Sequence, residues 1–343
     1  MKLGVFTHLS WHPQQNQNEV FYNSIEQVKL AEAMGFQGAW FAEHHFTRYS
    51  MGSSVAVILG HIAACTSDIR LGSAVFVPLL HNPVRLAEDI ATLDILSGGR
   101  IDVGFGRGTY GYEYAGYGVP GEGSQQRFRN SVLDIQNLWM GNDTGFHSEY
   151  NVDVNLVPHT YQEPHPPIFI AATKSHETLD FLIDYGFKIC IAVVQDTKDA
   201  INLINRYKKA CLQKGRPSYM KEVPFFRYVH VALTEREADE NVKLHLDWIQ
   251  DVMQWRRHLT RTTEVGRDID EWKKIRSDPP PSYEYIKKNR AFIGTPESVI
   301  RQISELKSHG IEYFGCNFSL AGLSQEKILA SMRLFDQKVR PFI

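Results

Sequence analysis

Short apolar runs alternate along the chain with longer segments in which apolar residues recur at helical spacing. The clearest helical pattern begins at Asn82-Pro83 and ends at Ser97-Gly98-Gly99, with proline at the first helical position. Strands that alternate with helices favour parallel pairing through right-handed crossovers. The apolar runs predict eight strands, over Lys2–Phe6, Ala39–Ala42, Ile69–Val77, Ile101–Phe105, Ile168–Ala172, Lys188–Val194, Phe225–Leu233 and Tyr313–Leu320.

A (β/α)8 TIM barrel is closed by eight strand-helix units. We therefore predict this α/β fold, as one domain over residues 1–343. An open doubly wound sheet would share the same alternation. The segment 235–290 is too long for a plain strand-to-helix connection and contains Asp278-Pro279-Pro280-Pro281, which forbids helix. Long insertions in barrels usually lie over the carboxyl ends of the strands, so we expect this segment to act as a lid.

The composition is that of an ordinary globular protein, with 43% hydrophobic and 22% charged residues and a formal net charge of -2 over 343 residues. Nothing in this balance directs the molecule to nucleic acid or to an anionic membrane. The first residues are too polar for a signal peptide, and no apolar run is long enough to span a bilayer, so we expect a cytoplasmic protein. The four cysteines are widely separated, which favours buried free thiols over a disulfide framework or a zinc site.

In a barrel, catalytic groups are expected directly after the carboxyl ends of the strands. These positions hold His8, the segment Glu43-His44-His45, the segment Gly106-Arg107-Gly108 and Thr173-Lys174-Ser175. One face of the predicted barrel therefore collects imidazoles, a guanidinium, hydroxyls and glycines.

Two of these segments together indicate an anion site. Arg107 offers a planar guanidinium that suits phosphate. Ser175 and Thr178 lie where a helix begins, so their hydroxyls and the free backbone amides can hold an anion. The alternative is that Ser175 only caps its helix and that the glycines around Gly106 only ease a turn.

Imidazoles titrate near neutral pH and can exchange a proton with a reacting oxygen, which makes Glu43-His44-His45 a candidate catalytic segment. Because neighbouring residues at a strand end point to opposite sides, at most one of the two histidines should face the pocket. No second histidine-carboxylate pair has ligand spacing, so a metal is not expected. The alternative is a structural histidine held by hydrogen bonds in the barrel mouth. Trp248 and Trp255 recur at helical spacing, which is typical of packing, and Arg256-Arg257 is expected on a solvated face.

Several longer motifs, in order along the chain, resemble the bacterial luciferase-like, flavin-dependent monooxygenases, and in particular their catalytic alpha subunit, which is an alkanal monooxygenase. The resemblance covers essentially the whole sequence. The motifs that carry it are Phe41-Ala42-Glu43-His44-His45-Phe46-Thr47, His81-Asn82-Pro83-Val84-Arg85-Leu86-Ala87-Glu88-Asp89, Leu93-Asp94-Ile95-Leu96-Ser97-Gly98-Gly99-Arg100, Gly294-Thr295-Pro296-Glu297 and Ala330-Ser331-Met332-Arg333-Leu334-Phe335.

The resemblance implies a barrel that receives reduced FMN from a separate flavin reductase and uses O2 to oxygenate a small organic substrate through a C4a-peroxyflavin. It implies aldehyde or ketone oxidation or hydroxylation, a homodimer, and a mobile lid over 258–290. His44 matches the catalytic histidine, with Glu43 beside it. The resemblance also implies cofactor-binding residues, namely Ala74, Val75, Gly106, Arg107, Ser175 and Thr178. The Ala74-Val75 pair falls where the family carries a cis peptide bond. The residues implied at the substrate pocket are His8, His45, Val193 and Trp248.

Two departures change this expectation. Gly106 stands where luciferase has a reactive cysteine near the flavin, and Val193 replaces an aromatic residue of the pocket. We therefore expect a monooxygenase that does not emit light. The alternatives are an F420-dependent oxidoreductase on the same barrel and a non-catalytic flavin-binding partner subunit, and the presence of His44 and Arg107 argues against the latter.

Overall fold

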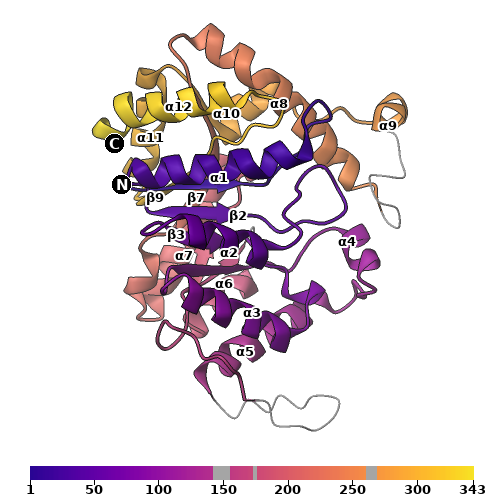
Figure 1. Cartoon of the computed structure of the whole chain (residues 1–343), viewed down its shortest axis with the longest axis vertical. Coiled ribbons are helices and arrows are strands. Elements are labelled where there is room, and N and C mark those ends of the chain that lie inside the picture. The colour runs from indigo at the N-terminus through magenta and orange to yellow at the C-terminus, as the bar shows by residue number, and fades with distance from the viewer. Residues whose placement is uncertain (142–154, 173–175, 260–268) are drawn as a thin grey trace.

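The predicted alternation of strand and helix is present in the computed structural model, which describes residues 1–141, 155–172, 176–259 and 269–343 (Figure 1). The strands are β1 (Lys2–Thr7), β2 (Gly38–Phe41), β3 (Arg70–Ser73), β4 (Ile101–Phe105), β5 (Ile168–Ala171), β6 (Lys188–Cys190), β7 (Pro224–Val231), β8 (Ala291–Gly294) and β9 (Tyr313–Asn317). The helices are α1 (Gln17–Ala33), α2 (Val55–Cys65), α3 (Pro83–Leu96), α4 (Gly111–Gly116), α5 (Ser124–Met140), α6 (His176–Asp184), α7 (Thr197–Gln213), α8 (Glu235–Arg256), α9 (Ile269–Ile275), α10 (Tyr283–Arg290), α11 (Pro296–Ser308) and α12 (Gln325–Lys338).

All pairs between these strands are parallel, in one curled sheet with the order β6-β5-β4-β3-β2-β1-β9-β7-β8. A backbone bridge between Ile191, just after β6, and Phe225, in β7, brings the first strand of this order beside the second last. The sheet therefore curls round on itself in a barrel-like form. Parallel strands of this kind are buried on both faces, which explains why β7 and β9 are buried along their whole length.

The structure contains one strand, β8, that the apolar pattern does not predict. β8 pairs with the second half of β7, from Tyr228 to Val231, whereas the first half of β7 pairs with β9. A four-residue apolar run is too short to give a periodic signal, and it directly follows the segment 235–290, for which the sequence predicts no regular pattern. The described residues therefore form nine strands rather than the predicted eight.

Large aromatic side chains fill the interior of the curled sheet. The ring of Phe226 stacks on Phe6 at 4.7 Å and packs against Trp40 at 5.7 Å, and the indole N–H of Trp40 donates to the Tyr313 hydroxyl at 2.6 Å. Gly72 makes this packing possible, because a Cβ atom there would lie 2.2 Å from the Trp40 ring. These side chains close the floor below the carboxyl ends of the strands.

The segment 235–290 differs from the expected irregular insertion in its first part. Residues 235–256 form the 22-residue helix α8, which begins at Thr234, whose side chain accepts a hydrogen bond from the Glu237 N–H. One face of α8 is buried and packs against β7 and β8. The remaining part holds α9 and α10, and residues 260–268 of the expected lid lie outside the described residues.

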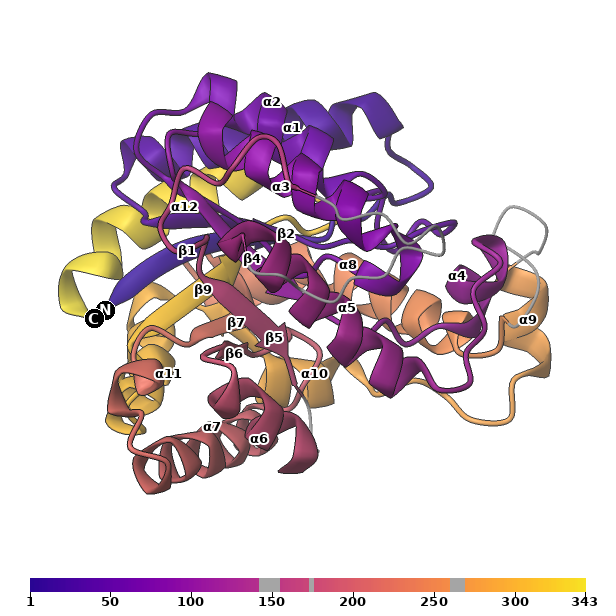
Figure 2. The same cartoon turned by 90° about the horizontal axis from the view of Figure 1, so that it is seen from below.

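Figures 1 and 2 both show α4, α9 and the end of α8 gathered beyond one end of the sheet, whereas the two chain termini lie at the opposite end. β1 starts near the termini, so the gathered segments lie at the carboxyl ends of the parallel strands. Of the four cysteines, three are buried as expected, but Cys65 is exposed. No helix in the part of the chain that the structure describes is long and apolar enough to cross a membrane.

Candidate functional site

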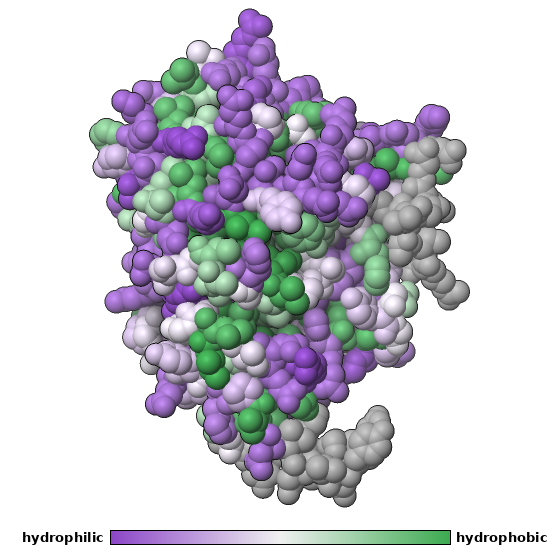
Figure 3. Space-filling model, viewed as in Figure 1, coloured by the Kyte–Doolittle hydropathy of each residue, from purple (hydrophilic) through white to green (hydrophobic). Residues whose placement is uncertain are grey.

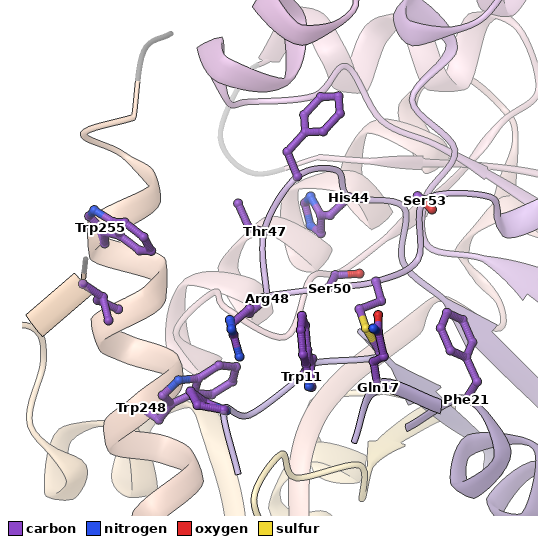
Figure 4. A pocket seen from close by; sticks show the side chains of 14 residues that line it. Trp11, Gln17, Phe21, His44, Thr47, Arg48, Ser50, Ser53, Trp248 and Trp255 are labelled. Carbon is purple, nitrogen blue, oxygen red and sulfur yellow. The ribbon is translucent and has the colours of Figure 1, made fainter. Parts of the chain in front are cut away.

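Two cavities open at the carboxyl ends of the strands. The smaller, of about 360 Å³, is lined by residues that follow six of the strands, β1 to β6, among them His8, His44, Val75, Arg107 and Val193, and by Phe226 within β7. The larger, of about 710 Å³, is lined by the loops after β1 and β2 and by α1 and α8 (Figure 4). His44 is the one residue that lines both cavities among the described residues.

Glu43 lies at the centre of a buried hydrogen-bond network on one side of the segment after β2. Its carboxylate contacts His45 Nε2 at 3.0 Å and His81 Nε2 at 2.9 Å, and it accepts from the Val77 N–H at 3.1 Å. The Tyr117 hydroxyl lies 2.9 Å from the other ring nitrogen of His45. Burial opposes ionisation of Glu43, but the two histidines outweigh it and lower the pKa of this carboxyl. With three partners at its carboxylate, Glu43 is suited to hold the segment in place.

His44 points to the other side, into a second cluster. Its Nδ1 atom lies 3.1 Å from Glu113 Oε1, at α4, and 3.1 Å from Nη2 of Arg256, the last residue of α8. Burial and the nearby Arg256 charge lower the pKa of His44, while Glu113 acts in the opposite direction. His44 keeps 22% of its side chain exposed, towards the cavities that it lines. A neutral imidazole is therefore held at one edge and open at the other.

His8 and Tyr49 extend this cluster within the smaller cavity. The Tyr49 hydroxyl lies 3.1 Å from His8 Nε2, and the His8 and His44 rings are 6.4 Å apart. Burial, with help from the neighbouring His44 and Arg256, holds the pKa of His8 well below its usual value. His8 is accordingly neutral and serves as a hydrogen-bonding wall of the cavity.

Two of the predicted anion-binding groups line the smaller cavity. Arg107 is exposed and Thr178, in the first turns of α6, is half-buried, and both line this cavity together with Gln125 from α5. Ser175 lies outside the described residues. The peptide bond between Ala74 and Val75 is cis, as the resemblance implied, and both residues line the same cavity.

The wall of the larger cavity is rich in aromatic rings. Trp248 and Trp255 project from α8, and Trp11 lies in the loop after β1, where the Arg48 guanidinium packs over its ring at 4.1 Å (Figure 4). Trp248 therefore lies at a cavity, as expected for a pocket residue, and also packs edge-on against His12 at 5.3 Å. This cavity suits an apolar or unsaturated molecule.

Two expectations about these residues are wrong. His45 does not line either cavity, because it is buried between Glu43 and Tyr117. Arg256 is not solvated but fully buried, because α8 continues to this residue and turns it toward His44. The structure also adds a thiol to the smaller cavity, that of Cys190, and burial raises its pKa to about 12.

A comparison with protein-family models decides the family. Residues 1–313 match the model described as luciferase-like monooxygenase. The chain belongs to this family.

Curated relatives of this luciferase-like monooxygenase cover almost the whole chain at low identity. The oxygenase component of the flavin-dependent trigonelline monooxygenase of Acinetobacter baylyi is 26% identical, over 99% of this chain and 95% of that protein. The alkanal monooxygenase alpha chain of the Kryptophanaron alfredi symbiont is also 26% identical, over 100% of this chain and 98% of that one. The chain is therefore an oxidoreductase of the monooxygenase type.

Solved structures share the fold along the whole chain. The monooxygenase RslO1 from Streptomyces bottropensis has a TM-score of 0.86 at 21% identity and covers 99% of both chains. The oxygenating constituent of 3,6-diketocamphane monooxygenase from Pseudomonas putida, in complex with FMN, has a TM-score of 0.74 at 16% identity, covering 100% of this chain and 99% of that one. The F420-dependent tetrahydromethanopterin reductase of Methanopyrus kandleri has a TM-score of 0.72 at 20% identity, with the same coverage.

Proposed function

We propose that this luciferase-like monooxygenase is the oxygenase component of a two-component system, which takes reduced FMN from a separate reductase and uses O2 to oxygenate a small organic substrate. The observation that carries the proposal is the position of His44 between two cavities. A cofactor in one cavity and a substrate in the other would meet at this side chain. The relatives named as flavin-dependent oxygenase components support the need for a partner reductase.

The residues of the smaller cavity fit FMN. Its volume of about 360 Å³ lies within the range of roughly 300–1,000 Å³ common for small-ligand sites. Arg107 and Thr178 would hold the phosphate at one end, and Ala74, Val75 and Gly106 would border the ring system. When bound, reduced FMN supplies the electrons that activate O2. The chain itself would position the cofactor, bound the cavity on the barrel side with the Phe6 and Phe226 rings, and offer the His44 imidazole to the reacting oxygen.

The larger cavity would admit the substrate, which reaches the reaction through its contact with His44. Aldehyde or ketone oxidation and hydroxylation are all compatible with a neutral imidazole beside an apolar, aromatic wall. Gly106 and Val193 stand where the luminescent relatives carry a cysteine and an aromatic residue, so we propose oxygenation without light. Of the expected lid, Ile269 in α9 lines this cavity, so we propose that α9 covers the bound substrate.

A deazaflavin, F420, is the competing cofactor, since a structural neighbour is named for it. Anaerobic equilibrium titration of the protein with reduced FMN and with reduced F420 separates the two. Arg107→Met is expected to weaken FMN binding by at least tenfold, because a charge-assisted hydrogen bond contributes about 1.5–3 kcal/mol. Arg85→Met, an exposed residue of α3, is the matched control. Tighter binding of F420 than of FMN would refute the proposed cofactor.

Oxygenation is tested separately from binding. The protein is mixed with an FMN reductase, NADH and a panel of aldehydes, ketones and phenols, and O2 uptake is compared with H2O2 release. A monooxygenase shows uptake without matching peroxide for at least one compound. A partner subunit without activity would release peroxide in full with every one.

We also propose a homodimer. The exposed side chains Val57 on α2 and Ile95 and Leu96 on α3 are 71%, 44% and 70% accessible, and Figure 3 shows apolar side chains on the face where Figure 1 places these helices. Exposed apolar patches of this kind commonly mark interfaces. Light scattering should give twice the mass of one chain, and the Leu96→Asp variant should have the mass of a single chain.

A further inference from the structure

Arg256 is an arginine with no exposed surface, held rigidly beside the two cavities. Its guanidinium carbon lies 4.0 Å from the ring centres of both Tyr49 and Tyr110, and its Nε donates to the Tyr112 hydroxyl at 2.7 Å. Burying a guanidinium is costly unless its N–H groups find acceptors. The plane of this side chain is therefore fixed, and the acceptors available to its remaining N–H groups decide its role.

One nitrogen of this guanidinium faces both His44 and Glu113. Nη2 of Arg256 lies 3.1 Å from His44 Nδ1 and 3.3 Å from Glu113 Oε1, and those two atoms are 3.1 Å from each other. A guanidinium only donates hydrogen bonds and a carboxylate only accepts them. Arg256 therefore requires a lone pair at Nδ1 of His44, whereas Glu113 favours a proton there, and only one of the two can be satisfied.

The count of donors and acceptors favours the hydrogen bond from Arg256 to His44 Nδ1 over the one from His44 Nδ1 to Glu113. Glu113 Oε1 already has three donors without His44, namely the His45 backbone N–H at 3.1 Å, Arg256 Nη2 at 3.3 Å and the Tyr112 hydroxyl at 3.5 Å. Nη1 of Arg256 has no hydrogen-bond partner among the described residues. If Nδ1 of His44 were protonated, a second N–H of the same buried cation would lose its acceptor, and an unsatisfied buried donor costs about 1–3 kcal/mol, more for a charged group.

We propose that Arg256 is a positioning residue that keeps Nδ1 of His44 unprotonated, so that Nε2 carries the ring proton and presents an N–H to the cavities. This is the reverse of the usual histidine-carboxylate pair, in which Nδ1 donates to the carboxylate and Nε2 is left as a base. His44 then donates a hydrogen bond to an oxygen atom in the cavity. Only this use of the N–H rests on the proposed monooxygenase function; the tautomer is a property of the protein without ligand.

The other charged and titratable groups around His44 are consistent with a neutral ring. They come from the end of β1 (His8), the segment after β2 (His45, Tyr49), the residues at α4 (Tyr110, Glu113) and the end of α8 (Arg256). Glu113 is the one carboxylate close to the Nδ1 edge among the described residues, and its charge is matched by Arg256 at 3.3 Å. The pair therefore leaves no net negative charge to hold a second proton on His44.

The experiment is a long-range ¹H–¹⁵N correlation spectrum of the ligand-free, full-length protein with ¹⁵N-labelled histidine. The His44 signals are assigned by their loss in His44→Gln. We expect Nε2 to appear as the protonated nitrogen and Nδ1 as the unprotonated one at pH 7.5. A wild-type spectrum in which Nδ1 carries the proton overturns the proposal, and this result requires no variant of Arg256 to fold.

Variants then test whether Arg256 is the cause. Arg256→Met should move the proton to Nδ1, next to Glu113, and shift the titration of His44 to higher pH. Arg256→Lys keeps a donor with a positive charge and should restore the wild-type tautomer at least in part. Arg257→Met, at the exposed neighbour of Arg256, is the matched control and should leave the His44 signals unchanged. An unchanged tautomer and titration in a folded Arg256→Met protein would show that Arg256 only packs.

Discussion

Two neighbouring histidines on the segment after β2 occupy opposite kinds of surroundings. His45 is 2% exposed, and both of its ring nitrogens have partners, Glu43 and Tyr117. His44 has its Nδ1 edge shared between Glu113 and Arg256 and its other edge toward two cavities. The first surroundings stabilise the fold, whereas the second leave one imidazole edge available for chemistry. The difference teaches that identical side chains acquire their roles from the partners that tertiary structure supplies.

The largest effects, on activity and on stability respectively, are expected when His44 and His45 are each replaced by alanine. His44→Ala should lower coupled oxygenation by at least a hundredfold, because a positioned acid-base group contributes roughly 10²–10⁴, and should keep its fold and FMN binding. His45→Ala should instead lower the free energy of unfolding. Product yield per reduced FMN and chemical denaturation measure the two. If both variants changed product yield and stability equally, the assignment of His44 to activity and of His45 to stability would be wrong.

The next effect concerns Glu43, whose carboxylate lies within 3.1 Å of His45, His81 and the Val77 N–H. Glu43→Gln should lower the free energy of unfolding by about 3 kcal/mol, because removing one partner of a buried ion pair leaves the other uncompensated. Urea denaturation measures it, with the exposed Glu19→Gln as control. If Glu43 instead took part directly in the reaction, the variant would lose activity while its stability stayed at the wild-type value.

A smaller effect is expected at the edge of the same network. Tyr117→Phe removes the hydroxyl 2.9 Å from His45 Nδ1, and a single hydrogen bond of this kind contributes about 1 kcal/mol. Stability should fall by that amount, and the titration of His44 should not move. A shift of the His44 signals would mean that the two surroundings are coupled through the backbone.

The smallest effect is a difference in pH dependence. Burial opposes protonation of His81, but its contact with Glu43 outweighs this and raises its pKa, so its contribution to stability is complete below about 6.5 and is lost as the pH rises through the folded-state value. The pKa of His44 is lowered by burial and by Arg256, so stability is lost in the opposite direction, as the pH falls below about 6.5. Stability curves should therefore flatten above about pH 6.5 in His81→Gln and below about pH 6.5 in His44→Gln. Flattening on the same side would contradict the assignment.

The sequence predicted the parts of this site that depend on local rules. Alternation along a strand end implies that at most one of His44 and His45 faces the pocket, and the strand ends place His8 and Arg107 at the same cavity. The sequence does not predict the contacts of Glu113 and Arg256 with His44, because these residues lie 69 and 212 positions away from it along the chain. The helical spacing of Trp248 and Trp255 predicts part of α8. Arg256 directly follows Trp255 in this helix, but the spacing alone does not indicate that its side chain is buried beside His44.

The single side chain shared by the two cavities has a consequence for how the protein can diversify. Substitutions on the wall formed by Trp11, Trp248 and Trp255 alter one chamber and leave the described lining of the other intact. If the larger cavity holds the substrate, as proposed, evolution or a protein engineer can change which molecule is oxidised and leave the proposed cofactor site unaltered.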